Sequence, residues 1–388
     1  MFMTVGPDPG ALRDDVREAA AAVAARHPRK EWLEHARAGR HLDVMWSEMA
    51  DSGLLGLGIP PELGGSGGGL TELAILMDTL ATAGVPTLHL VLTGLVQAAL
   101  LRSATPEQFA RYVGPSMRGE QRLCLAVTEA NAGTNTFGVS TTASRRHDGW
   151  TVSGEKTFIT GADEAAHMFT IARSRELSEP EGRAALSIHM VPLDAPGVEL
   201  QKLDVEILQP ESQFTVILEG VELDAGTLIG PEGSGGPAMF DALNAERVLI
   251  AAMALGLGDH AVARAADYAN VRAPFGRPIG AYQAVQHRLA RAKAHIDAAR
   301  ALTYQAAEAF DRGDAAGTGC TTAKLLASEA GVEAVDAAIQ VHGGYAFSTD
   351  YDVLTLWPLV RLLCVAPVNN EMALNMIGER ILGFPRSY

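Results

Sequence analysis

Basic residues and cysteines are scarce in this chain of 388 residues. Lys and Arg number 31 against 46 Asp and Glu, which gives a formal net charge of −15. Because nucleic-acid binders and proteins attached to anionic membranes both need clustered basic residues, this balance argues against both kinds of partner. The three cysteines, Cys124, Cys320 and Cys364, do not have the spacing of metal ligands. We therefore expect reduced thiols and no metal site.

Long hydrophobic runs are also absent. The most apolar stretch, 248–257, is about ten residues long and is followed by Gly258, which is too short for a membrane span and predicts a buried core helix. Residues 1–10 have neither the basic nor the apolar region of a secretory signal. These features predict a cytoplasmic protein with no membrane partner.

Two common site motifs are not found after a predicted strand. The pattern Gly-x-Ser-x-Gly occurs only within the glycine-rich run at 64–69, which follows no predicted strand, and no Gly-x-Gly-x-x-Gly follows a predicted strand. The glycine-rich run at 64–69 lacks the Lys-Ser or Lys-Thr of a phosphate-binding loop, so we interpret it as a plain loop. A Rossmann domain is therefore not expected.

Hydrophobic periodicity divides the chain into three zones. Apolar residues recur at helical spacing before about residue 121 and again after about 235, whereas 122–234 has short stretches of period two and an Asp148-Gly149 hairpin signal. The chain is therefore predicted to be α+β and mainly α. The expected domains are an N-terminal α-helical domain at 1–121, a middle antiparallel β-barrel domain at 122–234 and a C-terminal helical bundle at 235–388.

Individual elements follow from the same patterns. Helices are expected at 12–26, 46–52, 71–83, 88–103, 107–117, 237–271, 282–312, 318–342, 353–363 and 370–382. Strands are expected at 138–145, 150–153, 157–160, 168–172, 186–191, 198–200 and 214–218. The polar stretch 174–183 is expected to be a surface loop between strands.

One corner of the chain concentrates side chains suited to ligand binding. An alanine-rich helix runs to Arg272, breaks at Pro274-Phe275-Gly276 and gives way to a second helix that carries Gln283. An arginine, an aromatic ring and an amide at a rigid turn can bind a flat, anionic, hydrogen-bonding ligand such as a dinucleotide. Gly343 and Gly344 would let a ligand approach the backbone closely, and they would equally end a helix.

These segments resemble the acyl-CoA dehydrogenase flavoproteins. Residues 272–279 resemble that family's Arg-x-x-Phe-Gly-x-Pro-Ile signature, and 340–345 are similar to its Gln-x-x-Gly-Gly-x-Gly segment. In the β zone, 128–135 and 154–161 are similar to its Thr-Glu-Pro-x-Ala-Gly-Ser-Asp and Gly-x-Lys-x-x-Ile-Thr-Asn segments. The resemblance covers essentially the whole chain and implies the family's three-domain fold, with a C-terminal four-helix bundle.

The resemblance implies FAD as the cofactor, held by two groups of residues. The contacts around the flavin ring would be Leu125, Val127, Thr128, Thr134, Phe158, Ile159 and Thr160. The contacts at the adenosine and pyrophosphate would be Arg272, Phe275, Gln283, Gln340, Gly343 and Gly344. In the family the corner at 272–286 serves the neighbouring subunit, so a homotetramer built as a dimer of dimers is expected.

The catalytic base departs from the usual pattern of the family. Pro367 stands where most members have the glutamate that removes the α-proton. Members such as isovaleryl-CoA dehydrogenase place this base directly before an arginine near the start of the long helix, which here is Glu246-Arg247. A carboxylate at the entry of an apolar helix is a suitable general base. Glu371 is the alternative base, and Asn244 and Arg247 would bind substrate.

The implied reaction is FAD-dependent α,β-dehydrogenation of an acyl-CoA or carrier-bound acyl thioester, with electrons passed to an electron-transfer flavoprotein. Two alternatives stay open: an oxidase or monooxygenase on the same fold, and a partner subunit of a heteromeric dehydrogenase. The residue pattern does not predict acyl chain length. The small residues at 251–258 would give room for a branched or bulky acyl group.

Overall fold

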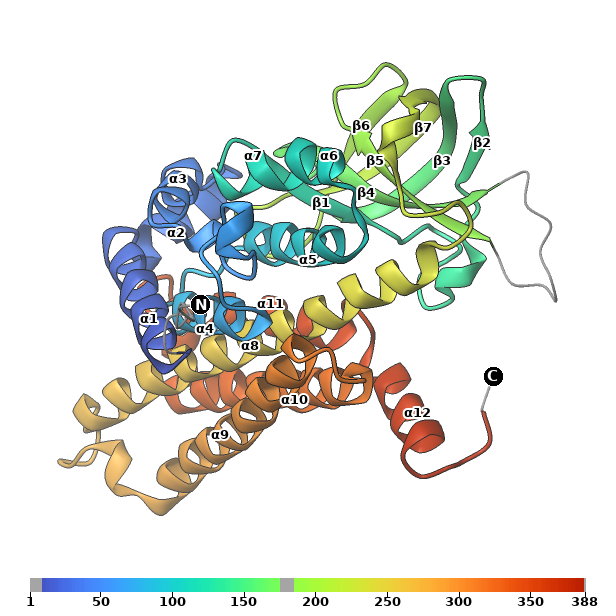
Figure 1. The fold of residues 1–388 in the computed structure, drawn as a ribbon. Helices are drawn as coiled ribbons and strands as arrows, with labels where there is room; N and C mark the ends of the chain where they lie inside the picture. Colours follow the sequence, from blue (N-terminus) through green and yellow to red (C-terminus); the bar gives the residue numbers. More distant parts are fainter. Residues whose placement is uncertain (1–8, 175–184, 387–388) are drawn as a thin grey trace, which may run out of the picture. The chain divides into compact units, whose positions relative to one another are not determined.

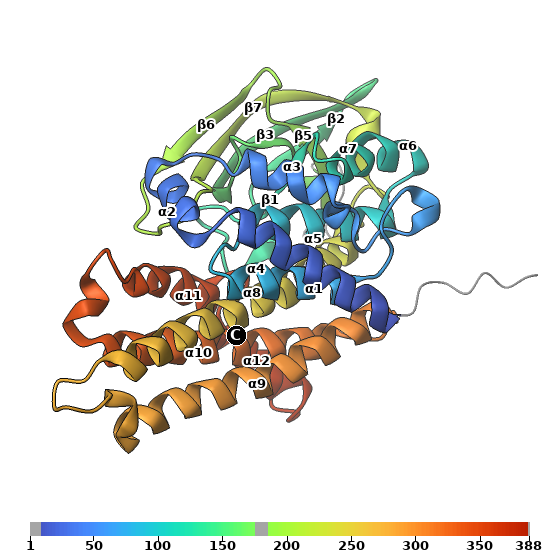
Figure 2. The same ribbon diagram turned by 90° about the vertical axis from the view of Figure 1, so that its left-hand side faces the viewer.

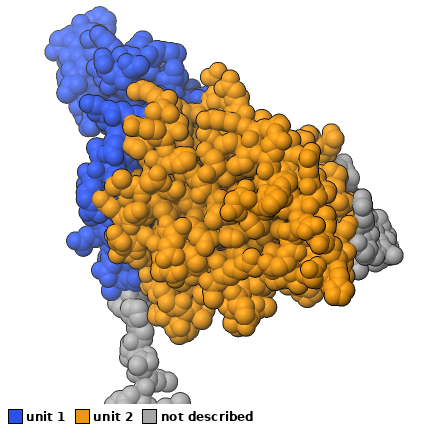
Figure 3. Space-filling model, turned by 90° about the horizontal axis from the view of Figure 1, so that it is seen from above, with its two compact units in different colours: residues 1–34, 68–86, 247–388 blue, residues 35–67, 87–246 orange. Residues whose placement is uncertain are grey.

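The computed structural model describes residues 9–174 and 185–386 (Figure 1). The chain forms two compact units, each built from separate stretches of sequence (Figure 3). Unit 1 comprises 1–34, 68–86 and 247–388, and unit 2 comprises 35–67 and 87–246. Residues 1–8 of the N-terminal segment and 175–184 of the predicted surface loop lie outside the described residues.

An eight-stranded sheet forms the body of unit 2. Its strands are β1 (Arg122–Ala126), β2 (Thr142–Arg145), β3 (Gly149–Thr160), β4 (Ala165–Ser174), β5 (Leu186–Pro192), β6 (Val198–Leu203), β7 (Gln213–Asp224) and β8 (Leu228–Ile229). The order is β6-β7-β3-β2-β4-β5-β8, with β1 paired to β4. Both β1 and β2 run parallel to β4, so the sheet is mixed and not wholly antiparallel as predicted. The physical reason is that the chain completes the β2–β3 hairpin before it returns to form β4.

The predicted hairpin at Asp148-Gly149 is confirmed, because Arg145 pairs with Trp150 in an antiparallel register. The stretch 157–160, expected as a strand of its own, is instead the end of the long strand β3. The register of β3 against β7 shifts between Lys156 and Ile159. This irregularity falls within the motif that the family resemblance assigns to the flavin.

Helices precede and flank this sheet. They are α3 (Asp43–Asp51), α5 (Leu88–Ser103), α6 (Pro106–Gln108), the π-helix η3 (Phe109–Val113) and α7 (Gly114–Met117). Helix α5 has the predicted bounds and packs on β1. Its N-terminus is held by Glu211, whose Oε1 accepts hydrogen bonds from Thr87 Oγ1 at 2.6 Å and Leu88 N at 2.8 Å. The predicted helix 107–117 is interrupted by the π-helix η3. The sequence did not predict α2 (Arg29–Ala38). This helix begins in unit 1 and ends in unit 2.

Unit 1 is helical. It contains α1 (Pro9–Arg26), α4 (Leu70–Thr82), α9 (Gln283–Asp311), α10 (Gly317–His342), α11 (Leu356–Val365) and α12 (Asn370–Arg380). The long helix α8 (Gly235–Val271) begins in unit 2 and belongs to unit 1 from Arg247 onward. Figure 2 shows α9 and α10 running side by side. The small residues of α8 allow close helix packing: a Cβ on Gly256 would lie 2.5 Å from Asp78 O of α4, and one on Gly331 of α10 would lie 2.9 Å from Ala254 O.

This packing corrects the expectation that 251–258 leaves room for an acyl group. Every residue from Ala251 to Gly258 is buried, and a Cβ on Gly258 would lie 2.9 Å from the Ile296 side chain. Neighbouring helices already fill the space beside these small residues. The Ala- and Gly-rich run therefore serves contact between helices.

Two described helical segments have the length and hydropathy to cross a membrane. The first is Gly235–Val271, of which 72% of the most apolar window is buried in the protein, and the second is Val353–Arg380, with 39% buried. The first segment contains the predicted helix 237–271, and most of its apolar window is buried, as expected of a core helix. Both are weak evidence for a membrane, since the core helix of a soluble protein meets the same criteria.

The N-terminus of α4 is capped by a side chain from the last residue of α9. Asp311 Oδ1 accepts from Leu70 N at 2.6 Å, and its Oδ2 accepts from Thr71 N at 3.0 Å and Thr71 Oγ1 at 2.7 Å. A carboxylate at this position satisfies amide donors that have no partner within the helix and lies at the positive end of the helix dipole.

We expect Asp311→Ala to lower the free energy of unfolding by about 1–2 kcal/mol, the usual cost of removing a helix cap. Urea denaturation followed by circular dichroism measures this change. The exposed Asp336 on α10, changed to Ala, is the matched control and should stay within about 0.5 kcal/mol of the wild type. Equal losses for the two variants would contradict the capping role.

The His189 side chain makes unit 2 sensitive to acid. It is fully buried in β5, edge-on to the Trp150 ring at 5.0 Å between centroids, and burial lowers its pKa from 6.5 to about 4. Between these values the unfolded chain binds the proton and the folded chain does not, so stability rises with pH from about 4 to about 6.5.

We therefore expect His189→Phe to reduce the loss of Tm between pH 7 and pH 5, as measured by differential scanning calorimetry. The exposed His147, changed to Gln, is the control and should leave the pH dependence as in the wild type. An unchanged slope in His189→Phe would show that another group causes the acid sensitivity.

Candidate functional site

In unit 2, the structure brings together the two motifs predicted to face the flavin ring. The chain leaving β1 passes through Val127 and Thr128 beside the end of β3, where Thr157 N donates to Thr128 O at 3.0 Å. At the end of β3, the Thr160 hydroxyl and the Gln213 amide of β7 are hydrogen-bonded at 2.8–3.0 Å. Val127 and Ile159 are buried, and Leu125 is half-buried. These predicted residues are therefore neighbours in space as well as matches to the family's motifs.

Phe158 has an unusual backbone and an exposed side chain. Its φ is 56°, in the left-handed region, and its side chain is 63% exposed. Both features are unfavourable for a phenylalanine, and a non-glycine residue in this region costs of the order of 1–2 kcal/mol. Buried residues on both sides, Lys156 and Ile159, hold β3 in this conformation. The arrangement presents an aromatic face outward, as binding of a flat apolar ring requires.

A buried ion pair links these two segments, and sequence analysis missed it. Lys156 is fully buried, and its Nζ lies 2.9 Å from Glu129 Oε1 and 3.1 Å from Val127 O. Burial lowers the pKa of Lys156 to about 8, against the opposing effect of Glu129. Burial alone would raise the pKa of Glu129, but hydrogen bonds from Ser140 and Thr141 and the charge of Lys156 lower it to about 2. The sequence feature that could have indicated this pair is one charged residue inside each motif, Glu129 in 128–135 and Lys156 in 154–161.

The remaining predicted residues of unit 2 lie on a loop and on α8. Thr134 is exposed in the loop that leads from Glu129 toward β2. Asn244 and Glu246 are both half-buried in α8, ahead of the buried run that starts at Val248. Glu246 is therefore partly shielded from solvent, as a general base at this position requires.

In unit 1, the corner around Arg272 and the turn after α10 line one groove of about 750 Å³. Arg272 lies over the Tyr345 ring, with its Cζ 5.7 Å from the centroid. Gly344 lines the groove, and no atom outside its own segment lies within 4 Å of where a Cβ would sit on Gly343 or Gly344. Of the predicted set, Phe275, Gln283 and Gln340 are exposed and are not among the residues lining this groove.

Tyr268 and His342, which sequence analysis did not select as site residues, line the groove, and Tyr351 packs against them outside the lining. Tyr268 stacks on His342 at 4.5 Å between centroids, and Tyr351 meets the Tyr268 ring edge-on at 5.4 Å. His342 is buried, its Nδ1 lies 2.8 Å from Ala338 O, and burial lowers its pKa. Tyr268 lies on α8, His342 on α10 and Tyr351 after α10. No local sequence pattern predicts this cluster, because only the fold brings the three residues together.

The two sets of residues fit the two ends of FAD. An arginine, bare glycine backbone and aromatic faces suit a diphosphate and an adenine. Backbone groups at strand ends and an exposed aromatic ring suit an isoalloxazine. The residues in the two units therefore agree with the cofactor that the resemblance implied.

The alternative acid and the departure from the family pattern both lie in unit 1. Glu371 is exposed in the first turn of α12. Pro367 follows α11 and is half-buried. Lys324, buried in α10, donates to Val368 O at 2.6 Å and to Asn370 Oδ1 at 2.9 Å, and so holds the segment after Pro367.

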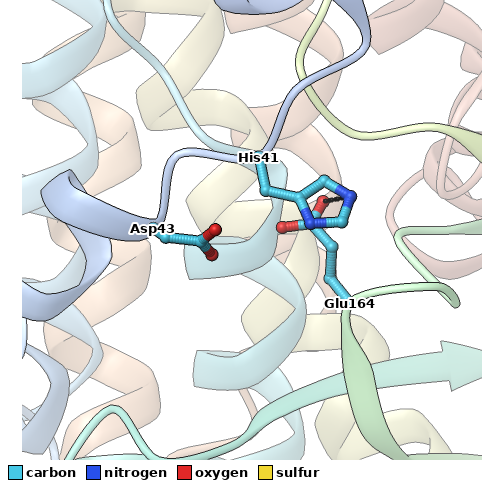
Figure 4. A group of neighbouring side chains, drawn as sticks. All are labelled: His41, Asp43 and Glu164. Atoms are coloured by element: carbon cyan, nitrogen blue, oxygen red, sulfur yellow. Dashed lines mark ion pairs between the residues drawn. The ribbon is translucent and has the colours of Figure 1, made fainter.

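A second polar cluster in unit 2 has donors of the kind that bind metals. His41, Asp43 and Glu164 each place a ligand atom within 4.8 Å of the others (Figure 4). Arg122, however, lies 2.8 Å from Asp43 Oδ1 and 3.4 Å from Glu164 Oε2. Because one guanidinium already contacts both carboxylates, this cluster is better described as an ion-pair network than as a metal centre.

Comparison with known proteins gives matches along nearly the whole chain. The models for the N-terminal, middle and C-terminal domains of acyl-CoA dehydrogenase match residues 7–120, 124–212 and 233–382. Acyl-CoA dehydrogenase FadE12 of Mycobacterium tuberculosis is 36% identical over 379 residues, which is 97% of each chain.

Solved structures with a similar fold also match nearly the whole chain. The butyryl-CoA dehydrogenase of Megasphaera elsdenii is 25% identical with a TM-score of 0.91, covering 98% of this chain and 100% of that one. A structure described as the electron transferring flavoprotein of Acidaminococcus fermentans has a TM-score of 0.89 at 25% identity, with the same coverage.

We expect Phe158→Gly to leave the cofactor-free protein as stable as the wild type or up to about 1 kcal/mol more stable, because glycine adopts a positive φ without strain. The same change should weaken FAD binding, since the aromatic face is lost. Thermal denaturation and flavin-fluorescence titration measure the two effects. Phe137, 45% exposed and at a centroid distance of 6.2 Å from the Phe240 ring, is the control. Phe137→Gly should lower the thermal stability of the chain. A similar loss of stability in Phe158→Gly would argue against backbone strain at Phe158.

Proposed function

Because this chain belongs to the acyl-CoA dehydrogenase family of FAD-dependent oxidoreductases, we propose that it oxidises the Cα–Cβ bond of an acyl thioester to the trans-2-enoyl thioester. The substrate is an acyl-CoA or a carrier-bound acyl thioester. The observation that carries the proposal is Glu246, a half-buried carboxylate directly ahead of the buried run of α8, in a chain with Pro367 at the usual glutamate position.

Glu246 acts as the general base and takes the α-proton. Partial burial favours this role, because a shielded carboxylate is less well solvated and gains more by accepting a proton. Asn244 and Arg247, two residues before and one after it on α8, bind the substrate. Bound FAD supplies the acceptor for the hydride that leaves the β-carbon, so the two hydrogens depart to different groups.

FAD is held by the residues of the two sets. The ring contacts in unit 2 are Leu125, Val127, Thr128, Thr134, Phe158, Ile159 and Thr160. The unit 1 set is Arg272, Phe275, Gln283, Gln340, Gly343 and Gly344, and it contacts the adenosine and pyrophosphate of a flavin bound mainly by a neighbouring subunit. A cofactor shared in this way requires an oligomer, for which we propose a homotetramer.

The electron acceptor for the bound cofactor would be an electron-transfer flavoprotein in the cytoplasm. The family resemblance and the similarity to the structure from Acidaminococcus fermentans support this acceptor. The net charge of −15 gives no support for a nucleic-acid or anionic membrane surface as a further partner.

Pro367 favours two alternative functions that use the same fold. An oxidase or monooxygenase needs no glutamate at that position, and such an enzyme would show no bleaching of its flavin with any thioester in the absence of oxygen. A partner subunit of a heteromeric dehydrogenase would not bind one flavin per chain when purified alone. A tetramer with one FAD per subunit would exclude the second alternative.

We expect Glu246→Gln to slow anaerobic flavin reduction by an acyl-CoA by about 10²- to 10⁴-fold, the usual contribution of a general base. Gln keeps the size and polarity of the side chain, so FAD content should not change. Stopped-flow absorbance of the flavin with a panel of acyl-CoA esters measures the rate and reveals the preferred substrate.

The matched control is Glu371→Gln, at the exposed alternative acid on α12. We expect it to keep the wild-type rate within a few-fold. A full rate in Glu246→Gln together with a large loss in Glu371→Gln would transfer the role of base to Glu371.

A further inference from the structure

The buried pair of Glu129 and Lys156 connects three segments of unit 2 at the candidate flavin site. Glu129 Oε2 accepts from Ser140 N and Ser140 Oγ, both at 2.6 Å, and its Oε1 accepts from Thr141 N at 2.9 Å. Lys156 of β3 completes the set at 2.9 Å. One carboxylate thus joins the exit of β1, the approach to β2 and the body of β3, and it closes the loop 130–139 at its base.

The backbone around the pair is closely packed. Gly154 of β3, with φ of 153°, lies so near Thr141 that a Cβ would come within 2.4 Å of the Thr141 hydroxyl. The Thr157 N–H of β3 donates to Thr128 O at 3.0 Å. The exit of β1 and the end of β3 therefore have little freedom to shift against one another.

Stability alone does not account for such a pair. Burying a carboxylate and an ammonium has a large desolvation cost, and well-packed apolar residues of similar size are often as stable. What an apolar pair could not supply is a defined set of hydrogen bonds to Val127 O, Ser140 N and Thr141 N. The pair therefore contributes a unique arrangement of these backbone segments.

The lysine also acts on one particular peptide group. Val127 O, which accepts from Lys156 Nζ at 3.1 Å, belongs to the same peptide unit as the Thr128 N–H. A cation bonded to the carbonyl polarises the peptide and makes its N–H a stronger donor. In the proposed function, the backbone at Thr128 faces the flavin ring.

We infer that Glu129 and Lys156 are positioning residues for the flavin: they fix the strand ends at Thr128 and Phe158, and the Lys156 ammonium strengthens the Thr128 N–H as a donor to the ring. A stronger donor stabilises the electron-rich reduced ring and raises its reduction potential. This inference rests on the placement of the flavin ring given under the proposed function. It does not depend on the identity of the substrate or of the base.

The test compares Lys156→Met and the double variant Glu129→Gln/Lys156→Met with the wild type, each loaded with FAD. Chemical reduction in the presence of a reference dye gives the two-electron potential, and flavin fluorescence gives the dissociation constant. We expect a tenfold shift of the redox equilibrium toward oxidised flavin, about 30 mV more negative, and at least tenfold weaker FAD binding in both variants.

Glu164→Gln is the matched control. Glu164 is a buried carboxylate of the same unit and pairs with Arg122 at the opposite end of β1, with 3.4 Å between Nη1 and Oε2. We expect it to lower the Tm of the cofactor-free protein without changing the flavin potential. In the single variant Lys156→Met, Glu129 stays buried without its cation and could destabilise the fold. The double variant removes both buried charges and so avoids this effect.

Folded variants with unchanged potential and FAD affinity would overturn the inference, as would failure of both variants to fold, since the pair would then serve the fold itself. A potential shift in Glu164→Gln equal to that in Lys156→Met would overturn it as well. The measurement uses no thioester. A shifted potential in a protein that no acyl thioester reduces would therefore refute the proposed function and leave this inference standing.

Discussion

The close contact of α8 with its neighbours is the constraint on which the helical part of this chain depends. Gly256 allows the helix to approach α4 at a distance that a Cβ would not permit, and Gly331 of α10 does the same against Ala254. A helix held this closely cannot rotate about its axis without a clash. The orientation of the side chains in this part of α8 is therefore set by packing against α4 and α10.

Much of the fold could be predicted from local patterns, and the exceptions have local explanations. The bounds of α5 agree with the prediction, because a strongly apolar segment begins after Pro86 and ends in polar residues. Helix α2 was missed, because most of its residues are charged or polar and only three of the ten are buried. The parallel pairing of β1 with β4 was missed because nothing within either strand specifies a partner about forty residues away.

The candidate site shows the same division. The sequence motifs selected the segments that carry Thr128 and Phe158, and in the structure these two segments meet through the hydrogen bond from Thr157 N to Thr128 O. The bond of Lys156 to Glu129, by contrast, joins residues 27 positions apart in the sequence, and the stack of Tyr268 on His342 joins different helices. A motif marks where chemistry is expected, whereas the groups that orient it come from the tertiary fold.

The strained conformation of Phe158 has a consequence for the protein before its cofactor arrives. An empty chain carries both the backbone strain and a solvated aromatic ring, two unfavourable terms that a stacked ligand would remove or offset. A ligand that binds only the folded state stabilises it by mass action, in proportion to its free concentration. Newly made chains would then resist unfolding to an extent set by the concentration of free flavin around them.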